Sequence, residues 1–190
     1  EDHMDVSDAV QHRRALRTFD PRPVEEEKVH AMIEAMRLAP SCNNNQPWRL
    51  VVCSGSVLSK VKECLNRGNV WATAAPLIMV LAAKPSDDCR LNEGRDYYLF
   101  GCGMAVGQML LQATELGLTA HPIAGYDPVM ARVVLGIPND YVVIAFIICG
   151  YPGEDDSLLS DRQKVQQLLR PERRPIGHDF FLDAWGRPIS

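Results

Sequence analysis

The chain has 190 residues, of which 46% are hydrophobic and 23% are charged, and its formal net charge at pH 7 is −4. Length and composition exclude a disordered tail, a collagen-like fibre and a disulfide-stapled miniprotein, and they predict one domain with a sizeable core. Because acidic side chains outnumber basic ones, the chain has no general attraction to nucleic acid, and no nucleic-acid partner is expected.

Helices and strands alternate along the chain. Apolar residues at helical spacing predict helices at residues 5–14, 25–38, 57–65, 96–116, 128–135 and 161–169. Short apolar runs predict strands at residues 48–53, 77–83, 119–123 and 142–149. Because helices and strands follow one another in mixed order, we expect the α+β class rather than a regular βαβ array.

One predicted helix, at residues 96–116, is apolar on almost every side, which predicts burial in a core or at a subunit interface.

The longest apolar runs, 74–83 and 141–149, reach about half of the roughly 20 residues that a membrane-spanning helix needs, so no membrane partner is expected. Residues 1–4 lack a signal-peptide pattern and are expected to be an N-terminal remnant or disordered. The aromatic tail at 176–190 is expected to pack on a partner subunit.

The cysteines are scattered and form no C-x-x-C pair. They stand at positions 42, 53, 64, 89, 102 and 149. Without a secretion signal, this pattern predicts reduced thiols and a cytoplasmic location. Cys42 is either a catalytic nucleophile or an unreactive thiol in a loop. We favour the unreactive thiol, because no neighbouring residue in the sequence is marked as a base that would activate it. The five histidines lie far apart in sequence, so no metal site is expected.

Four polar segments are candidates for binding. Arg13, Arg14 and Arg17 place three guanidinium groups close together, which suits a phosphate, although a solvated helix end explains the same pattern. The side-chain amides of the segment 39–48 can form hydrogen bonds with the edge of a uracil-like ring. The alternative is that these residues simply form a turn. The segment 122–127 lets backbone approach a flat ligand at Gly125, or simply connects a strand to a helix.

The fourth segment, 170–175, is a second basic cluster and by itself is weak evidence for a binding site.

Several familiar motifs are missing from the sequence. The glycine-rich stretch 101–107 is not G-x-G-x-x-G and lies inside a predicted helix, and there is no P-loop, no H-E-x-x-H and no G-x-S-x-G. Nucleotide-loop, zinc-protease and serine-hydrolase chemistry are therefore not indicated.

Taken in order, these segments resemble the nitroreductase family of FMN-dependent flavoproteins. The family's R-R-S-x-R pattern is matched at 13–17 except at its serine, and its A-P-S-[SC]-x-N-x-Q-P-W loop is present at 39–48. Its P-I-x-G-[FY]-D segment is present at 122–127, and 173–175 matches its arginine-rich C-terminal pattern. The resemblance covers residues 5–175 and implies one FMN-binding domain. It also implies a mixed, largely antiparallel sheet flanked by helices, in an intertwined homodimer with FMN at the interface.

The resemblance also implies roles for individual residues. Those expected to hold the FMN phosphate and ribityl oxygens are Arg13, Arg14, Arg17, Arg173 and Arg174, with Ala15 in the same segment. Those expected to line the flavin ring from the other subunit are Pro40, Ser41, Cys42 and Asn44, supported by Gln46. The segment Pro122, Ile123, Ala124 and Gly125 is expected to bring backbone N–H groups of its last two residues near flavin N5.

The implied activity is hydride transfer from NADH or NADPH through flavin N5 to a small-molecule acceptor such as a nitroaromatic or a quinone, with ping-pong kinetics. Two departures from the family pattern bear on it. Ala15 replaces the usual Ser, and Ala124 stands where several members carry Glu, which leaves nicotinamide and acceptor preference open. Reductive dehalogenation, heterocycle dehydrogenation or flavin fragmentation on the same scaffold, and a non-catalytic FMN-binding regulator, remain alternatives.

Overall fold

The computed structural model describes residues 4–189, so residues 1–3 of the expected N-terminal remnant lie outside the described part. The chain divides after Leu159 into two compact units, which are described separately. Within the described residues, no helix combines the length and the apolar character that crossing a membrane requires.

The first unit is built on a four-stranded sheet with the spatial order β1-β2-β4-β3. Its strands are β1 (Trp48–Cys53), β2 (Leu77–Ala83), β3 (Thr119–Ile123) and β4 (Val142–Gly150). All three pairings between these strands are antiparallel. Every residue of the central strand β2 is buried, which explains why its sequence is a continuous apolar run rather than an alternating one.

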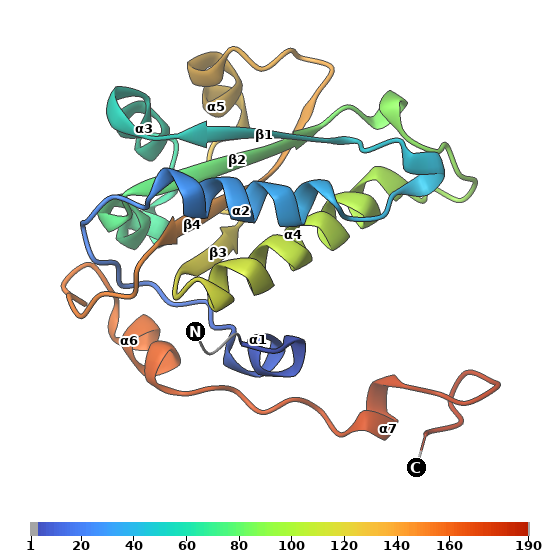
Figure 1. Ribbon diagram of the computed structural model, residues 1–190. Coiled ribbons are helices and arrows are strands. Elements are labelled where there is room, and N and C mark those ends of the chain that lie inside the picture. The colour runs from blue at the N-terminus through green and yellow to red at the C-terminus, as the bar shows by residue number, and fades with distance from the viewer. Residues whose placement is uncertain (1–3, 190) are drawn as a thin grey trace. The chain divides into compact units, whose positions relative to one another are not determined.

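Helices cover both faces of this sheet (Figure 1). On one face lie α2 (Glu26–Arg37) and α4 (Tyr97–Glu115), and on the other lie α3 (Gly55–Lys62) and α5 (Pro128–Leu135). Successive residues of β2 point to opposite faces, so Met79 joins the core beneath α2 and α4 while Val80 joins the core beneath α3 and α5. The sheet is therefore sandwiched between two apolar layers.

Shorter helices complete the chain. They are α1 (Val6–His12), the 3-10 turns η1 (Cys42–Asn44), η2 (Arg67–Ala74) and η3 (Pro85–Asp87), and α6 (Asp161–Leu168) and α7 (Ile176–Asp179) in the second unit. The predicted α+β class and all ten predicted helices and strands are confirmed to within about two residues at each end, except that α3 begins two residues and ends three residues early. The sequence patterns did not predict η1, η2, η3 or α7.

The long helix α4 is buried on one face only. Its buried residues include Cys102, Ala105 and Met109, which pack against α2 and the sheet, whereas Leu99 and Phe100 are 42% and 57% exposed. Burial in a core is confirmed for this face of the helix, and a place for its uncovered face in a subunit interface stays a prediction.

The second unit, residues 160–189, holds α6 and α7. Ser160 and Gln163 form a capping box at the start of α6. Phe181 and Trp185 pack against each other with ring centroids 5.0 Å apart, yet Trp185 is 93% exposed. Large exposed apolar side chains of this kind are typical of protein–protein contact surfaces, and packing of this tail on a partner subunit stays a prediction.

Candidate functional site

The arginine segment at 13–17 is irregular rather than helical, because α1 ends at His12. Arg13, Arg14 and Arg17 are all half-buried, so the segment is not a fully solvated helix end. The backbone carbonyl of Leu16 lies 2.9 Å from Nδ1 of His121 in β3, and this hydrogen bond fastens the segment to the edge of the sheet. A cluster of like charges is thereby held close to a buried strand.

A buried tryptophan supports this segment. Trp71 of η2 is 1% exposed, and its ring lies 4.9 Å from the ring of His121 and 6.2 Å from that of Phe19. The guanidinium carbon of Arg17 lies 5.9 Å from the Trp71 ring centroid, within range of a cation–π contact. Burial lowers the pKa of Arg17 because removal from water disfavours its charge. An anion beside Arg17 would offset that cost.

His121 is expected to make the protein less stable in mild acid. Burial lowers its pKa below the ordinary value, with the positive charges of Arg17 and Arg13 acting in the same direction. As the pH falls through about 6.5, the unfolded chain binds a proton that the folded chain does not, so the free energy of unfolding decreases by at most about 1.4 kcal/mol per pH unit from this group.

The measurement is urea unfolding of the wild-type protein and of His121→Asn between pH 7.5 and 5. We expect the variant to lose less stability over this range than the wild type. The other histidines are common to both proteins, so the comparison isolates the contribution of His121. Parallel pH curves for the two proteins would contradict the assignment.

The amide-rich loop between α2 and β1 is held in its conformation by hydrogen bonds within the loop. Ser41 Oγ accepts a hydrogen bond from the backbone N–H of Gln46, and Gln46 Nε2 donates to the carbonyl of Asn44. Asn43, Asn44 and Gln46 have φ angles of 48°, 58° and 48°, in the left-handed region that asparagine tolerates better than most residues. Such backbone conformations persist where surrounding contacts enforce them, and they are frequent at ligand-binding sites.

One surface cavity, of about 500 Å³, joins two of the predicted motifs. It is lined by Arg13 from the arginine segment and Pro40 from the amide-rich loop, with Met104 and Leu111 among the α4 residues. The family resemblance places the loop residues at the flavin of the other subunit. Within one chain, the fold brings Pro40 and Arg13 to a common cavity on α4.

Pro122 and Ile123 are the last two residues of β3 and are paired with β4, and Ala124 and Gly125 follow the strand directly. The carbonyl of Gly125 accepts hydrogen bonds from Asn69 Nδ2, at 2.9 Å, and from the backbone N–H of Asn66, at 3.1 Å. Ala124 is exposed. Because His121 binds Leu16 immediately before this segment, the arginine segment and the segment 122–125 are neighbours at one end of the sheet.

Replacement of Gly125 by Ala is expected to cost about 1 kcal/mol of stability, the value of one hydrogen bond. The added Cβ would overlap Asn69 Nδ2, so the Asn69 amide must move and lose its bond to Gly125. Chemical denaturation of Gly125→Ala, Asn69→Ala and the double variant measures this. In the Asn69→Ala background the Gly125 replacement should cost much less, and equal costs in both backgrounds would exclude the overlap as the cause.

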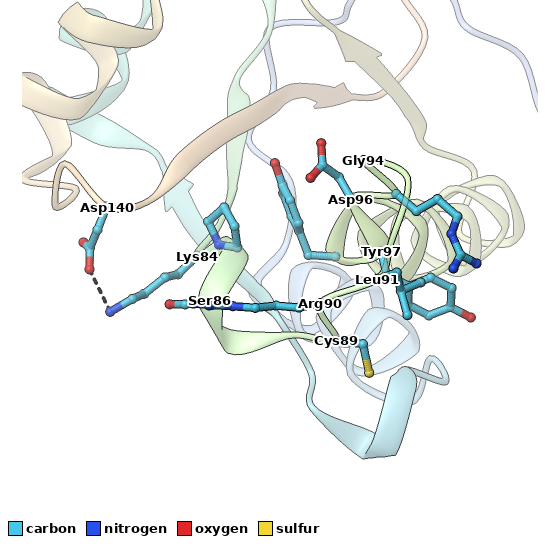
Figure 2. Close-up of a pocket in the computed structure, with 12 residues that line it drawn as sticks. Lys84, Ser86, Cys89, Arg90, Leu91, Gly94, Asp96, Tyr97 and Asp140 are labelled. Atoms are coloured by element: carbon cyan, nitrogen blue, oxygen red, sulfur yellow. Dashed lines mark ion pairs between the residues drawn. The ribbon is translucent and has the colours of Figure 1, made fainter.

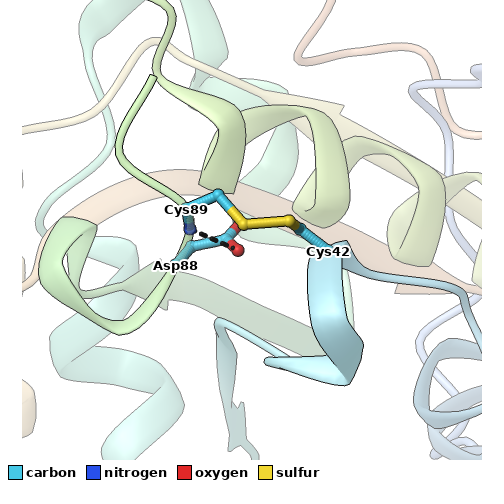
Figure 3. Close-up of side chains that lie close together, drawn as sticks. All are labelled: Cys42, Asp88 and Cys89. Atoms are coloured by element: carbon cyan, nitrogen blue, oxygen red, sulfur yellow. Dashed lines mark hydrogen bonds between the residues drawn. A yellow bond between two sulfur atoms is a disulfide. The ribbon is translucent and has the colours of Figure 1, made fainter. Parts of the chain in front are cut away.

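The prediction of six reduced cysteines is wrong for two of them: Cys42 and Cys89 form a disulfide, with Cα atoms 6.5 Å apart (Figure 3). The partners are separated by 47 residues, so only the folded chain reveals the pairing. The cytoplasmic prediction rested partly on reduced thiols, and the disulfide removes that reason. The remaining cysteines are free and buried, namely Cys53, Cys64, Cys102 and Cys149.

Asp88 lies beside this disulfide and is 7% exposed (Figure 3). Its Oδ1 accepts hydrogen bonds from Asn45 Nδ2, at 3.0 Å, and from the backbone N–H of Cys89, at 2.8 Å. Its Oδ2 is buried, and no described residue gives it a hydrogen bond. In the described part of the chain, Cys42, Asp88 and Cys89 are the one group whose ligand atoms are close enough for a metal, but both sulfurs are engaged in the disulfide.

A second cavity, of about 440 Å³, lies beside Cys89 (Figure 2). Arg90, Arg95 and Asp96 line it, together with Lys84, whose Nζ is 2.8 Å from Asp140 Oδ2. The segment 86–94, to which the sequence assigns no role, therefore forms one wall of a polar cavity.

Arg173 and Arg174 belong to the second unit, which is described by itself. Arg173 donates to the carbonyl of Pro171 at 3.2 Å, and Arg174 Nε lies 3.1 Å from Asp179 Oδ2. Their expected part in phosphate binding stays a prediction.

Sequence reasoning missed several residues that shape this site: Trp71, His121, Asn69, Asp88 and Cys89. His121 directly precedes the family segment at 122–127, and this position in the sequence could have marked it as a site residue. For Trp71 and Asp88 nothing local marks their position, since their partners are distant in sequence.

Comparison with known proteins assigns a family. A sequence model described as the nitroreductase family matches residues 10–69 and 60–151. A protein of Archaeoglobus fulgidus, named as a candidate NADH dehydrogenase/NAD(P)H nitroreductase, is 31% identical over 167 residues, covering 85% of this chain and 91% of its own. A protein of Rhodospirillum rubrum named 5,6-dimethylbenzimidazole synthase is 26% identical over 193 residues, covering 87% and 88%.

Solved structures share the fold over nearly the whole chain. A crystal structure described as an oxidoreductase containing FMN has a TM-score of 0.84 at 25% identity and covers 98% of this chain and 96% of its own. A nitroreductase family protein of Clostridium difficile 630 has a TM-score of 0.78 at 23% identity, with coverage of 95% and 99%.

Proposed function

The chain belongs to the nitroreductase family, and from that premise we propose that it is an FMN-dependent oxidoreductase that uses NADH or NADPH. The observation that carries the proposal is the half-buried set Arg13, Arg14 and Arg17, fixed to the sheet beside a cavity that Pro40 also lines. Guanidinium groups held in this way fit the phosphate of FMN, because their paired N–H groups match phosphate oxygens.

Each segment of the site has one role in this proposal. The three arginines hold the phosphate and the ribityl chain. A part for Arg173 and Arg174 in phosphate binding stays a prediction. The braced loop supplies Pro40, Ser41, Cys42 and Asn44 to line the flavin ring, and Gln46 keeps that loop in its conformation. Ala124 and Gly125 present backbone N–H groups to the ring near N5.

The chemistry that FMN supplies when bound is acceptance of a hydride at N5 and its release to an organic acceptor such as a nitroaromatic or a quinone, in a ping-pong sequence. No side chain of the site has to act as a general acid, since water can deliver the protons. Ala124 is small and exposed, so the space above it is open to acceptors of varied shape. A cytoplasmic location stays a prediction.

A homodimer is part of the proposal. The face of α4 that bears Leu99 and Phe100 is exposed in the single chain, and so are Phe180, Leu182 and Trp185 of the second unit. Obligate interfaces are rich in apolar and aromatic side chains of this kind. We propose that the residues 176–190 pack on the partner subunit and that residues 5–175 form the FMN-binding domain.

A different reaction on the same scaffold is the second candidate. A relative of similar length and 26% identity is named a synthase rather than a nitroreductase, so membership in the family does not fix the reaction. Ala124, in place of the glutamate of several members, leaves the acceptor equally open.

The test is anaerobic reduction of the flavin. The purified protein is reconstituted with FMN and mixed with NADH or with NADPH, and the flavin absorbance is followed. Bleaching by either nicotinamide, followed by recovery on addition of a quinone, is the expected result. A protein that binds no FMN would refute the proposal, whereas a flavin that neither nicotinamide reduces would favour the second candidate.

A further inference from the structure

The Cys42–Cys89 disulfide has the surroundings of a reactive disulfide rather than of a buried structural one. Both cysteines are partly exposed, and each lies in a loop or a short 3-10 turn rather than in the sheet. In the single chain, both residues of the disulfide therefore keep part of their surface open to solvent.

Two amide groups distinguish the two sulfurs. Asn43 Nδ2 lies 3.8 Å from Cys89 Sγ and Asn45 Nδ2 lies 3.7 Å from the same atom. These N–H donors stabilise negative charge that develops on Cys89 when the disulfide opens, and no described donor is directed at Cys42 Sγ in the same way. Cys89 is thus the better leaving sulfur, and Cys42 is the sulfur that an incoming thiolate attacks.

A buried carboxylate stands at the same place. The unpartnered Oδ2 belongs to Asp88, and the carboxylate lies within 4.8 Å of both sulfurs. A carboxylate oxygen in this position can take the proton of a Cys89 thiol as that thiol attacks. Its other neighbours do not compete for that proton, because Asp87 is paired with Arg49, and Cys102 on α4 has its pKa raised to about 12, chiefly by burial.

We propose that Cys42, Asp88 and Cys89 form a thiol–disulfide exchange centre for low-molecular-weight thiols, an activity that needs neither flavin nor nicotinamide. The thiolate attacks Cys42 Sγ, a mixed disulfide forms there, and the bond to Cys89 breaks with its electron pair on Cys89 Sγ. A second thiol molecule then releases Cys42, so that two thiols become one disulfide and the protein gains two electrons and two protons.

In the reverse, resolving step, the Cys89 thiol attacks the mixed disulfide at Cys42 and expels the small thiolate. Asp88 accepts the Cys89 proton and passes it to solvent. The four remaining cysteines cannot take part, because they are buried and burial raises their pKa, to about 11 for Cys53 and about 12 for Cys149.

The first test maps the mixed disulfide. The FMN-loaded protein is treated with reduced glutathione, alkylated with N-ethylmaleimide in the native state, unfolded, and mapped by mass spectrometry. We expect glutathione on Cys42 and the alkyl group on Cys89. Glutathione on Cys89, or a disulfide that survives a large excess of glutathione in the folded protein, would overturn the proposal.

The second test separates the two steps. After glutathione is removed, Asp88→Asn should close the disulfide about a hundredfold more slowly than the wild type, while the initial attack by glutathione is not slowed. Asp87→Asn, which changes the adjacent carboxylate, should leave both steps within about twofold of the wild type. Closure of Asp88→Asn at the wild-type rate, or an equal slowing of both steps, would show that Asp88 is not the base.

Discussion

Arg17→Ala and Arg13→Ala are each expected to weaken FMN binding by about 1.5–3 kcal/mol, or roughly 10- to 150-fold in Kd. Each replacement removes a charge-assisted hydrogen bond to the proposed phosphate. Arg17 is half-buried and lies over Trp71, so its guanidinium is already oriented and partly desolvated before a ligand arrives. Fluorescence titration of the apoprotein with FMN measures the effect.

Arg37→Ala provides the control for loss of one arginine. Arg37 lies at the end of α2, exposed and paired with Glu34 at 2.6 Å, and it does not line the cavity that Arg13 and Pro40 share. Its replacement should leave FMN affinity unchanged. Arg17→Lys keeps the charge but not the planar fork, and should lie between the wild type and Arg17→Ala. If Arg13→Ala and Arg17→Ala both bind FMN as the wild type does, the phosphate assignment is wrong.

Trp71→Ala is expected to lower the free energy of unfolding by about 3–5 kcal/mol, the usual range for removal of a large buried aromatic side chain. Trp71 is 1% exposed and is among the largest fully buried side chains of the described chain. It packs between Phe19 and His121 beneath Arg17, so its loss leaves a cavity directly under the proposed phosphate site. Because domains are stable by only about 5–15 kcal/mol, this one change removes a large share.

Trp71→Phe is the matched variant. It keeps an aromatic ring against Phe19 and removes an indole Nε1 that is buried and receives no partner among the described residues. The lost volume and the relief of that unpaired donor act in opposite directions, so we expect a loss below about 2 kcal/mol. Urea denaturation of the three proteins tests this, and a Trp71→Ala protein as stable as Trp71→Phe would contradict the packing argument.

The exchange centre and the flavin site share Cys42, which belongs to the loop proposed to line the ring. The disulfide ties this loop to the segment that forms a wall of the cavity beside Cys89. Opening it removes a cross-link across 47 residues, and the two segments then depend on weaker contacts, among them the bond from Asn45 to Asp88. The redox state of the protein therefore bears directly on how firmly the proposed ring-lining loop is held.

Local sequence patterns were sufficient for most of the fold. The helical spacing of Val29, Met32 and Met36 predicts α2, and the unbroken apolar run at 77–83 predicts a strand buried on both faces. Proline at the start and glycine after the end correctly bound α5. These features depend on residues within one turn or one strand of each other, so the chain order alone carries them.

Close backbone packing along α4 was only partly predictable. Glycines at 101, 103 and 107 indicate it, and at Gly101 a Cβ would stand 3.6 Å from Pro47. At Gly103 and Gly107 no described atom comes within 4 Å of such a Cβ. Sequence spacing identifies small residues on a helix, but which of them meets a neighbour depends on where the amide-rich loop is placed.

The sequence by itself determined the helices and strands, their α+β class and the resemblance that led to the family, because each depends on residues adjacent or nearly adjacent in the chain. Only the tertiary structure decided that Cys42 and Cys89 are bonded, that Asp88 is buried beside them, and that Trp71 and His121 support the arginine segment. The disulfide spans 47 residues, the bond from Asn45 to Asp88 spans 43, and the bond between His121 and Leu16 spans 105. Such contacts form only when the sheet and its two helical layers fold the distant segments together, which no local spacing encodes.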